Sequence, residues 1–238
     1  MVAGSPGKGS GRLSEGPLLD SGRLKFDREY TERVSARDGR ALILRLVRPS
    51  DKTKVLLAFA QLSARSRYLR FFASKSELTD DELRFLTETD CINHFAIAAL
   101  ERLEDGSEGQ GVGVARFVRE GEEPAAAEVA ITVIDEWQHR GVGRILLERL
   151  VEAARERSIE RFRFECLAEN EDVQLLFEEV CERVEVVGER EVLVGTATIT
   201  QPRDSAAIGG RAEPSLFDLL RAVARETFEK AGARLKRH

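Results

Sequence analysis

The stretch that decides the fold is EVAITVIDEWQHRGVG, residues 128–143. Its first seven residues are mostly apolar or β-branched, which predicts a strand over 128–134. After a short loop, Val142, Ile145, Leu146 and Leu150 recur at helical spacing and predict an amphipathic helix. A glycine-rich loop, QHRGVG at residues 138–143, therefore joins the end of a strand to the start of a helix.

This loop has the features of an anion site. The first N–H groups of a helix have no intrahelical acceptor and carry a partial positive charge, so they bind phosphate well. Gly141 and Gly143 allow close approach of the backbone, and Arg140 and Arg144 add charge. The spacing Q-x-x-G-x-G is neither the dinucleotide fingerprint nor a Walker loop, so another kind of phosphate loop is predicted.

The flanking segments predict an ordered series of strands and helices. Before the decisive stretch we expect a hairpin, three helical pieces and two strands, followed by the strand over 128–134 as a third member of an antiparallel meander. After it we expect a helix, a strand, a helix whose apolar face runs from Val173 to Val184, and a closing strand. The predicted strands are residues 41–47, 94–100, 111–118, 161–167 and 191–200, and the early helical pieces begin near residues 49, 63 and 79, the last with a TDDE capping box. The fold class is α/β (α+β).

Composition divides the chain into three parts. Residues 1–24 are rich in Gly, Ser and Pro and predict a flexible tail. Residues 25–201 form the predicted domain. Residues 202–238 predict a linker and an amphipathic helix over 215–231, whose apolar face must pack on the domain or on a second subunit, as in a homodimer.

Charge and composition exclude several classes of protein. The net charge of −5 argues against a nucleic-acid binder, and the acidic body suits a basic partner. No apolar run is long enough to span a membrane, and the N-terminus lacks the apolar core of a secretory signal. Three cysteines and three histidines, scattered along the chain, predict reduced thiols, a cytoplasmic location and no metal site.

Several single residues have structural interpretations. Cys166 and Cys181 lie on apolar faces and are predicted to belong to the core rather than to catalysis. His94 begins a strand and is predicted to be structural. Trp137 is predicted to pack beneath the glycine-rich loop.

The loop in its context resembles the GNAT acyltransferase superfamily. QHRGVG matches the pyrophosphate motif (Q/R)-x-x-G-x-(G/A), and Asn170 follows the next strand, as in that superfamily. The resemblance covers roughly residues 28–200. The segments VRPSD (47–51), SRYLRFF (66–72) and AEVA (127–130) are most similar to Pat-type bacterial protein lysine acetyltransferases. The resemblance implies the GNAT fold, a mixed and mostly antiparallel sheet flanked by helices, and acetyl-CoA as co-substrate. The predicted helix over 215–231 would be an extra C-terminal helix on this fold.

The resemblance also assigns site residues. Glu128, in the A-E-x-A strand, would be the general base, although without the resemblance the residue would better suit a solvent-facing surface position. Asn170 would hold the CoA arm, and it would also suit the N-cap of the following helix. The remaining cofactor-binding positions are Val133, which would bond the pantetheine arm through its backbone, and the loop residues Gln138, His139, Arg140, Gly141, Val142, Gly143 and Arg144.

Two positions depart from the pattern of relatives. Phe177 stands where many small-molecule GNAT enzymes have the tyrosine that protonates the CoA thiolate. The Leu-Gly-Phe ending of the fourth helix of the family is replaced by VCERV, residues 180–184. These departures leave open the source of that proton and the shape of the wall beside the acyl group.

Three functions remain compatible with these residues. The first is direct acetyl transfer to protein lysines in a ternary complex, with an acyl-CoA synthetase as one possible target. The second is acetylation of a small amine. The third is a non-catalytic acyl-CoA-binding module. None of the three involves nucleic acid or a membrane.

Overall fold

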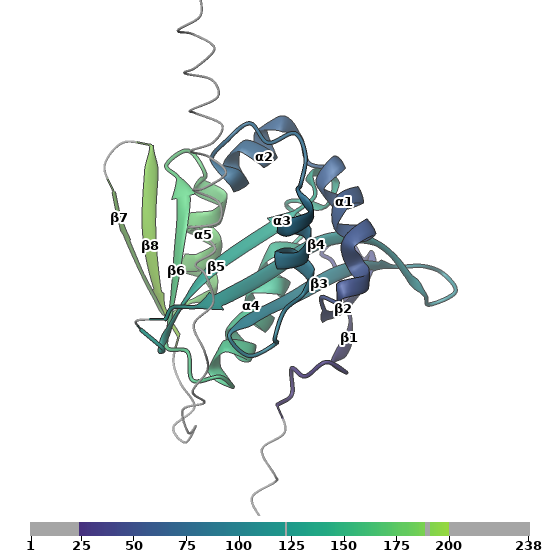
Figure 1. Ribbon diagram of the computed structural model, residues 1–238, viewed down its shortest axis with the longest axis horizontal. Coiled ribbons are helices and arrows are strands. Elements are labelled where there is room, and N and C mark those ends of the chain that lie inside the picture. Colours follow the sequence, from purple (N-terminus) through teal and green to yellow (C-terminus); the bar gives the residue numbers. More distant parts are fainter. Residues whose placement is uncertain (1–23, 122, 189–190, 200–238) are drawn as a thin grey trace, which may run out of the picture.

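The computed structural model describes residues 24–121, 123–188 and 191–199. In this part of the chain eight strands form one sheet in the order β1-β2-β3-β4-β5-β6-β8-β7 (Figure 1). The strands are β1 Thr31–Ser35, β2 Ala41–Leu46, β3 His94–Arg102, β4 Glu108–Arg119, β5 Ala126–Val133, β6 Arg161–Leu167, β7 Arg183–Val187 and β8 Val192–Thr198. All neighbours pair antiparallel except β5 and β6, which are parallel. This confirms the predicted mixed, mostly antiparallel sheet.

Helices cover both faces of the sheet. The first three, preceded by a 3₁₀ turn at Pro49–Asp51, lie over β3, β4 and β5 on one face, and the last two pack together on the other (Figure 1). The helices are α1 Lys52–Ala60, α2 Ala64–Phe71, α3 Asp80–Thr87, α4 Val142–Arg155 and α5 Glu171–Val180, and a second 3₁₀ turn spans Asp135–Trp137. No helix in the described part of the chain has the length and apolar character needed to cross a membrane.

Local chemistry explains where the helices start. Thr79 Oγ1 accepts a hydrogen bond from the Glu82 N–H at 3.3 Å, and Glu82 Oε2 accepts one from the Thr79 N–H at 2.8 Å. This is the predicted capping box of α3. Ser63 caps α2 in the same way by accepting from the Ser66 N–H.

The core is a continuous apolar layer that includes the face of α4. The aromatic rings of Phe95 and Phe117 stack with centroids 5.2 Å apart. Trp137 and Cys166 are buried, as predicted. Cys181 is half-buried and packs against the core, and burial raises the pKa of its thiol to about 11. Both thiols therefore belong to the packing of the domain.

The helix predicted after the strand at 161–167 is too long. Helix α5 ends at Val180, and Cys181 is already extended, with φ −98° and ψ 154°. Val184, predicted to lie on the apolar face of this helix, belongs instead to β7, where it pairs with Ala197 of β8. The spacing of Val184 from the preceding apolar residues fits the helical period of 3.6, and its spacing from Val186 fits the strand period of 2. The pairing with β8 decides in favour of the strand.

The parallel pair at the centre of the sheet is short. Ala126, Ala127 and Glu128 of β5 pair with Arg161, Phe162 and Arg163 of β6, and the pairing ends there. Beyond this point β6 continues beside β8 while β5 diverges (Figure 1). We call the opening between the two strands the fork.

The predictions for the two ends of the chain concern residues that are not described. The tail at 1–24, apart from its last residue, and the helix over 215–231 lie outside the described residues. Dimerisation through that helix stays a prediction.

Candidate active site

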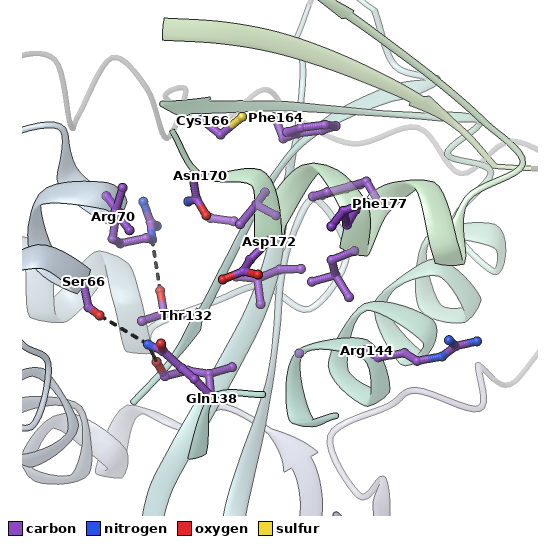
Figure 2. Close-up of a pocket in the computed structure, with 18 of the residues that line it drawn as sticks. Ser66, Arg70, Thr132, Gln138, Arg144, Phe164, Cys166, Asn170, Asp172 and Phe177 are labelled. Carbon is purple, nitrogen blue, oxygen red and sulfur yellow. Dashed lines mark hydrogen bonds between the residues drawn. The ribbon is translucent and has the colours of Figure 1, made fainter. Parts of the chain in front are cut away.

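A cavity of about 370 Å³ fills the fork (Figure 2). Its walls are residues 129–133 of β5, residues 164–166 of β6, the glycine-rich loop, the N-terminal part of α5, and α2. Segments distant in the sequence therefore meet in one site, which lies in the fork and has the glycine-rich loop at one end.

The loop takes up the backbone geometry that its glycines allow. Gly141 has φ +82° and precedes the first residue of α4, Val142. No side chain caps this helix N-terminus, so the N–H groups of its first turn are available to an anion. A side chain at Gly141 would bring Cβ to 3.0 Å from Cγ of Arg37, and His139 also has positive φ, at +57°.

Gln138 braces the loop rather than extending into solvent. Its Nε2 donates to Val133 O at 3.0 Å and to Ser66 Oγ at 3.2 Å (Figure 2). Asp135 accepts from the Ser63 N–H at 3.0 Å and from Ser66 Oγ at 3.1 Å. The loop is thereby fixed to both β5 and α2.

The two arginines predicted to add charge are engaged with carboxylates. Arg140 pairs with Asp38 and donates from Nε to Glu136 O at 2.8 Å, and it is not among the residues lining the cavity. Arg144 lines the cavity, but its guanidinium pairs with Glu148 at 2.9 Å and Glu179 at 3.0 Å. Arg140 therefore positions the loop, and Arg144 lies at the rim.

Arg37 is a site residue that the sequence analysis missed. It lies in the turn between β1 and β2, where its N–H donates to Arg140 O at 2.9 Å. Its side chain lines the cavity and contacts Gly141. The sequence identifies the turn but contains no signal that the turn docks on a loop about one hundred residues later.

Asn170 and Phe177 occupy the α5 side of the cavity. Asn170 is at the N-cap position but makes no side-chain capping hydrogen bond, and it lies at the cavity (Figure 2). The Phe177 ring stacks on Phe164, with centroids 3.9 Å apart and planes 9° apart. The wall is apolar at Phe177, the position at which the resemblance leads us to look for a tyrosine.

Glu128 lies at the closed end of the fork. It is the last residue of β5 that pairs with β6, and it lies opposite Val118 on β4 and Arg163 on β6. It is half-buried and is not among the lining residues of the cavity, which begin at the next residue, Val129. Burial raises the pKa of the neighbouring Glu120 carboxyl, and the charge of Glu128 adds to that rise.

A second, smaller cavity of about 110 Å³ adjoins the first, between the sheet and helices α1, α2 and α3. The two cavities share four lining residues, Leu62, Arg70, Ala130 and Thr132. The shared wall contains a hydrogen bond of 3.1 Å from Arg70 Nε to Thr132 Oγ1 (Figure 2).

Comparison with known proteins decides the family. Residues 59–182 match the sequence model described as the acetyltransferase (GNAT) family. The chain belongs to the GNAT acetyltransferase family. The GNAT relatives include acetyltransferase Pat of Mycolicibacterium smegmatis, 33% identical over 81% of this chain and 55% of the relative. Acetyltransferase PA5475 of Pseudomonas aeruginosa is 31% identical over 50% of this chain and 62% of the relative. The chain thus spans little more than half the length of these curated relatives.

Solved GNAT structures confirm the fold. The GNAT domain of S. lividans PAT superposes with a TM-score of 0.63 and 29% identity, over 71% of this chain and 96% of that domain. A cAMP-binding acyltransferase from Mycobacterium smegmatis gives a TM-score of 0.51 and 29% identity, over 82% of this chain and 54% of that protein. YncA of Salmonella typhimurium, solved with its cofactor acetyl-CoA, shares the fold at 15% identity and a TM-score of 0.54.

The residues present fit acetyl-CoA, the cofactor of the GNAT family. The uncapped first turn of α4 suits a pyrophosphate, and the edge of β5 that faces the fork suits an amide-containing arm. In the described part of the chain, no group of three His, Cys, Asp or Glu side chains is placed to hold a metal ion.

Proposed function

We propose that this protein is an acetyl-CoA-dependent N-acetyltransferase that acetylates lysine side chains of other proteins. The proposal rests on the fork cavity, which has the uncapped N-terminus of α4 at one end, and on Glu128, which lies at the closed end of the fork next to the lining residue Val129. The identity of 33% to Pat supports a protein acceptor. An acyl-CoA synthetase is one candidate target, and the cytoplasm is the proposed location.

The chain would hold the donor through its backbone. The N–H groups of the first turn of α4 bind the pyrophosphate, and the Val133 backbone and Asn170 hold the arm along the fork. Backbone N–H groups of β5 polarise the thioester carbonyl at the position where negative charge develops. Acetyl-CoA supplies the activated acetyl group.

Glu128 would remove the proton that blocks attack by the acceptor. A lysine ammonium has a pKa near 10.4 and cannot attack a thioester until it is deprotonated. Glu128 accepts this proton, directly or through a water, as the amine forms a C–N bond and the C–S bond breaks. A thiolate with a pKa of about 8.5 can leave without an acid, which is compatible with Phe177 in place of tyrosine.

The test of the proposal is mass spectrometry of lysine acetylation with acetyl-CoA and a lysate or candidate synthetase. We expect Glu128→Gln to lower kcat by about 10² to 10⁴ and to keep acetyl-CoA binding. Glu104→Gln, which makes the same change on the exposed turn between β3 and β4, should keep full activity. Full activity of Glu128→Gln would refute the assignment of the base.

The same assay separates the alternatives. Turnover of small amines without any protein acetylation would indicate a small-molecule acetyltransferase. Binding of CoA without turnover of any amine would indicate a binding module, a function favoured by one observation, the apolar Phe177–Phe164 stack at the position of the usual acid.

A further inference from the structure

The second cavity is mostly apolar, and its charged lining residues are Arg70, Arg116, Lys54 and Asp51. Arg116 extends from β4 and is only 3% exposed, and Arg70 extends from α2. The apolar lining consists mainly of Val47, Val55, Ala58, Phe59, Phe71, Leu78, Leu86, Ala98, Leu100, Val114 and Ile134. Cations inside an apolar cavity require compensation by an opposite charge or by strong acceptors.

The partners of Arg116 are neutral. Its Nη1 lies 3.2 Å from His94 Nε2, and its Nη2 donates to Leu86 O at 3.1 Å. Burial, together with the charge of Arg116, lowers the pKa of His94 to about 3, so the imidazole is uncharged at neutral pH. Burial, together with the nearby charge of Arg70, lowers the pKa of Arg116 to about 9.

Arg70 also has a neutral partner. Its hydrogen-bond partner is the Thr132 hydroxyl, and burial lowers its pKa to about 10. Neither Arg70 nor Arg116 belongs to an ion pair with a carboxylate in the part of the chain that is described. Asp51, the one carboxylate in the lining of this cavity, binds Arg45, so the two guanidinium groups place positive charge in the cavity without a carboxylate of their own.

Other buried arginines in this protein are compensated differently. Arg45 is 2% exposed and binds Asp51 at 2.7 Å and Glu108 at 2.7 Å. Arg119 and Arg157 donate to main-chain carbonyls and do not line either cavity. Among the buried and half-buried arginines of the described residues, only Arg70 and Arg116 line a cavity without pairing with a carboxylate.

We propose that the second cavity binds the terminal carboxylate of a short dicarboxylic acyl group, such as succinyl, carried on CoA. The inference rests on the proposed function, because the chain must enter from a thioester in the fork. Leu62, Arg70, Ala130 and Thr132 line both cavities and would form the passage. A carboxylate can accept two parallel hydrogen bonds from one guanidinium group and carries the opposite charge, so it suits these arginines better than a neutral group does.

The size of the cavity also indicates a short acyl tail. Its volume of about 110 Å³ is less than a third of the 370 Å³ of the fork cavity, which favours a short chain over a larger group. The reaction stays the same. The amine forms the C–N bond, the C–S bond breaks, Glu128 takes the amine proton, and the product is a lysine amide that carries a free carboxylate.

Calorimetric titration of the full chain tests this inference without an acceptor. The ligands are CoA, acetyl-CoA, butyryl-CoA and succinyl-CoA, of which the last two differ only by a methyl group in place of the carboxylate. We expect succinyl-CoA to bind about tenfold or more tightly than butyryl-CoA. Arg70→Met and Arg116→Met should each reduce this ratio to near one, while Arg84→Met, on the exposed side of α3, should leave it unchanged.

Each outcome has a distinct meaning. Equal affinity of succinyl-CoA and butyryl-CoA, with normal binding of acetyl-CoA, overturns the inference and leaves the proposed function standing. A preference that survives in folded Arg70→Met overturns the assignment of the guanidinium groups, and this variant also decides the matter if Arg116→Met does not fold. Failure of all four ligands to bind overturns both the inference and the proposed function.

Discussion

His94 shows how position fixes the charge of a single side chain. It begins β3, is 2% exposed, and lies between the ring of Phe85, with centroids 4.5 Å apart, and Arg116. Its predicted structural role agrees with these contacts. Burial and Arg116 together lower its pKa to about 3, compared with about 6.5 for an unfolded histidine.

This pKa predicts how stability depends on pH. Between pH 6.5 and about 3 the unfolded chain binds a proton at His94 that the native chain does not, so the free energy of unfolding falls as pH falls. The slope from this residue is at most about 1.4 kcal/mol per pH unit. We expect His94→Gln, which keeps an acceptor for Arg116, to reduce the loss of stability between pH 7 and 4.5 in urea unfolding.

The control for this measurement is His139→Gln, which changes an exposed histidine. It should keep the slope of the wild-type protein. Identical slopes for His94→Gln and the wild-type protein would show that His94 titrates normally in the native state.

Arg37 predicts an effect on cofactor affinity rather than on chemistry. Its side chain lines the fork cavity beside Gly141, where the pyrophosphate is proposed to bind. Hydrogen bonds to charged groups are worth about 1.5 to 3 kcal/mol, so Arg37→Met should raise the Kd of acetyl-CoA by about tenfold or more. In calorimetric titration, Arg33→Met on the exposed side of β1 should bind normally. An unchanged Kd in Arg37→Met would remove this residue from the site.

At the scale of elements, the loop between β5 and α4 depends on one backbone conformation. Gly141 has φ +82°, a region that costs other residues about 1 to 2 kcal/mol. An added Cβ would also lie 3.0 Å from Cγ of Arg37. We expect Gly141→Ala to lower the free energy of unfolding by about 1 to 2 kcal/mol and to weaken acetyl-CoA binding.

Gly39 provides a matched control for this substitution. Its φ is +86°, but a Cβ there would meet no atom within 4 Å. Gly39→Ala should therefore cost similar stability in urea unfolding and leave the Kd of acetyl-CoA unchanged. Equal weakening of binding by both variants would show that strain in general, and not contact at the loop, decides affinity.

Elements with strong local patterns could be predicted from the sequence. The strand at 161–167 has the predicted bounds, and the predicted apolar face of α4 is the face that is buried. Both could be predicted because each segment keeps a single hydrophobic period over its whole length. The start of α3 was predicted because its capping box is local. Strand β7 was missed because Val184 fits two periods, and only pairing with β8 decides between them.

The candidate site was predictable only in its local part. The glycine-rich loop and Asn170 lie at the cavity, as the motif implies. The docking of Arg37 on Gly141, the pairing of Arg140 with Asp38, and the second cavity depend on contacts between segments distant in the sequence. Such contacts leave no periodic signal in one chain.

At the scale of the whole molecule, the sheet consists of two parts joined at one place. Strands β1 to β5 form one part and β6 to β8 the other, and three residue pairs connect them. Arg163 adds ion pairs to Glu120 and Glu123 beside this junction. Above the junction the fork separates the two parts (Figure 1). A ligand in the fork contacts both parts and should therefore stabilise the whole domain.

This arrangement predicts that acetyl-CoA raises global stability. A ligand that binds only the native state at one hundred times its Kd adds about 2.7 kcal/mol to the free energy of unfolding. Trp137, the one tryptophan of the chain, is buried beneath the loop, with the Arg40 guanidinium 4.0 Å from its ring centroid, so its fluorescence reports unfolding. Urea unfolding followed by this signal should shift to higher midpoint with acetyl-CoA. Pantetheine, which lacks the pyrophosphate, should produce a smaller shift at equal concentration. Identical midpoints with and without acetyl-CoA would contradict a ligand site that joins the two parts of the sheet.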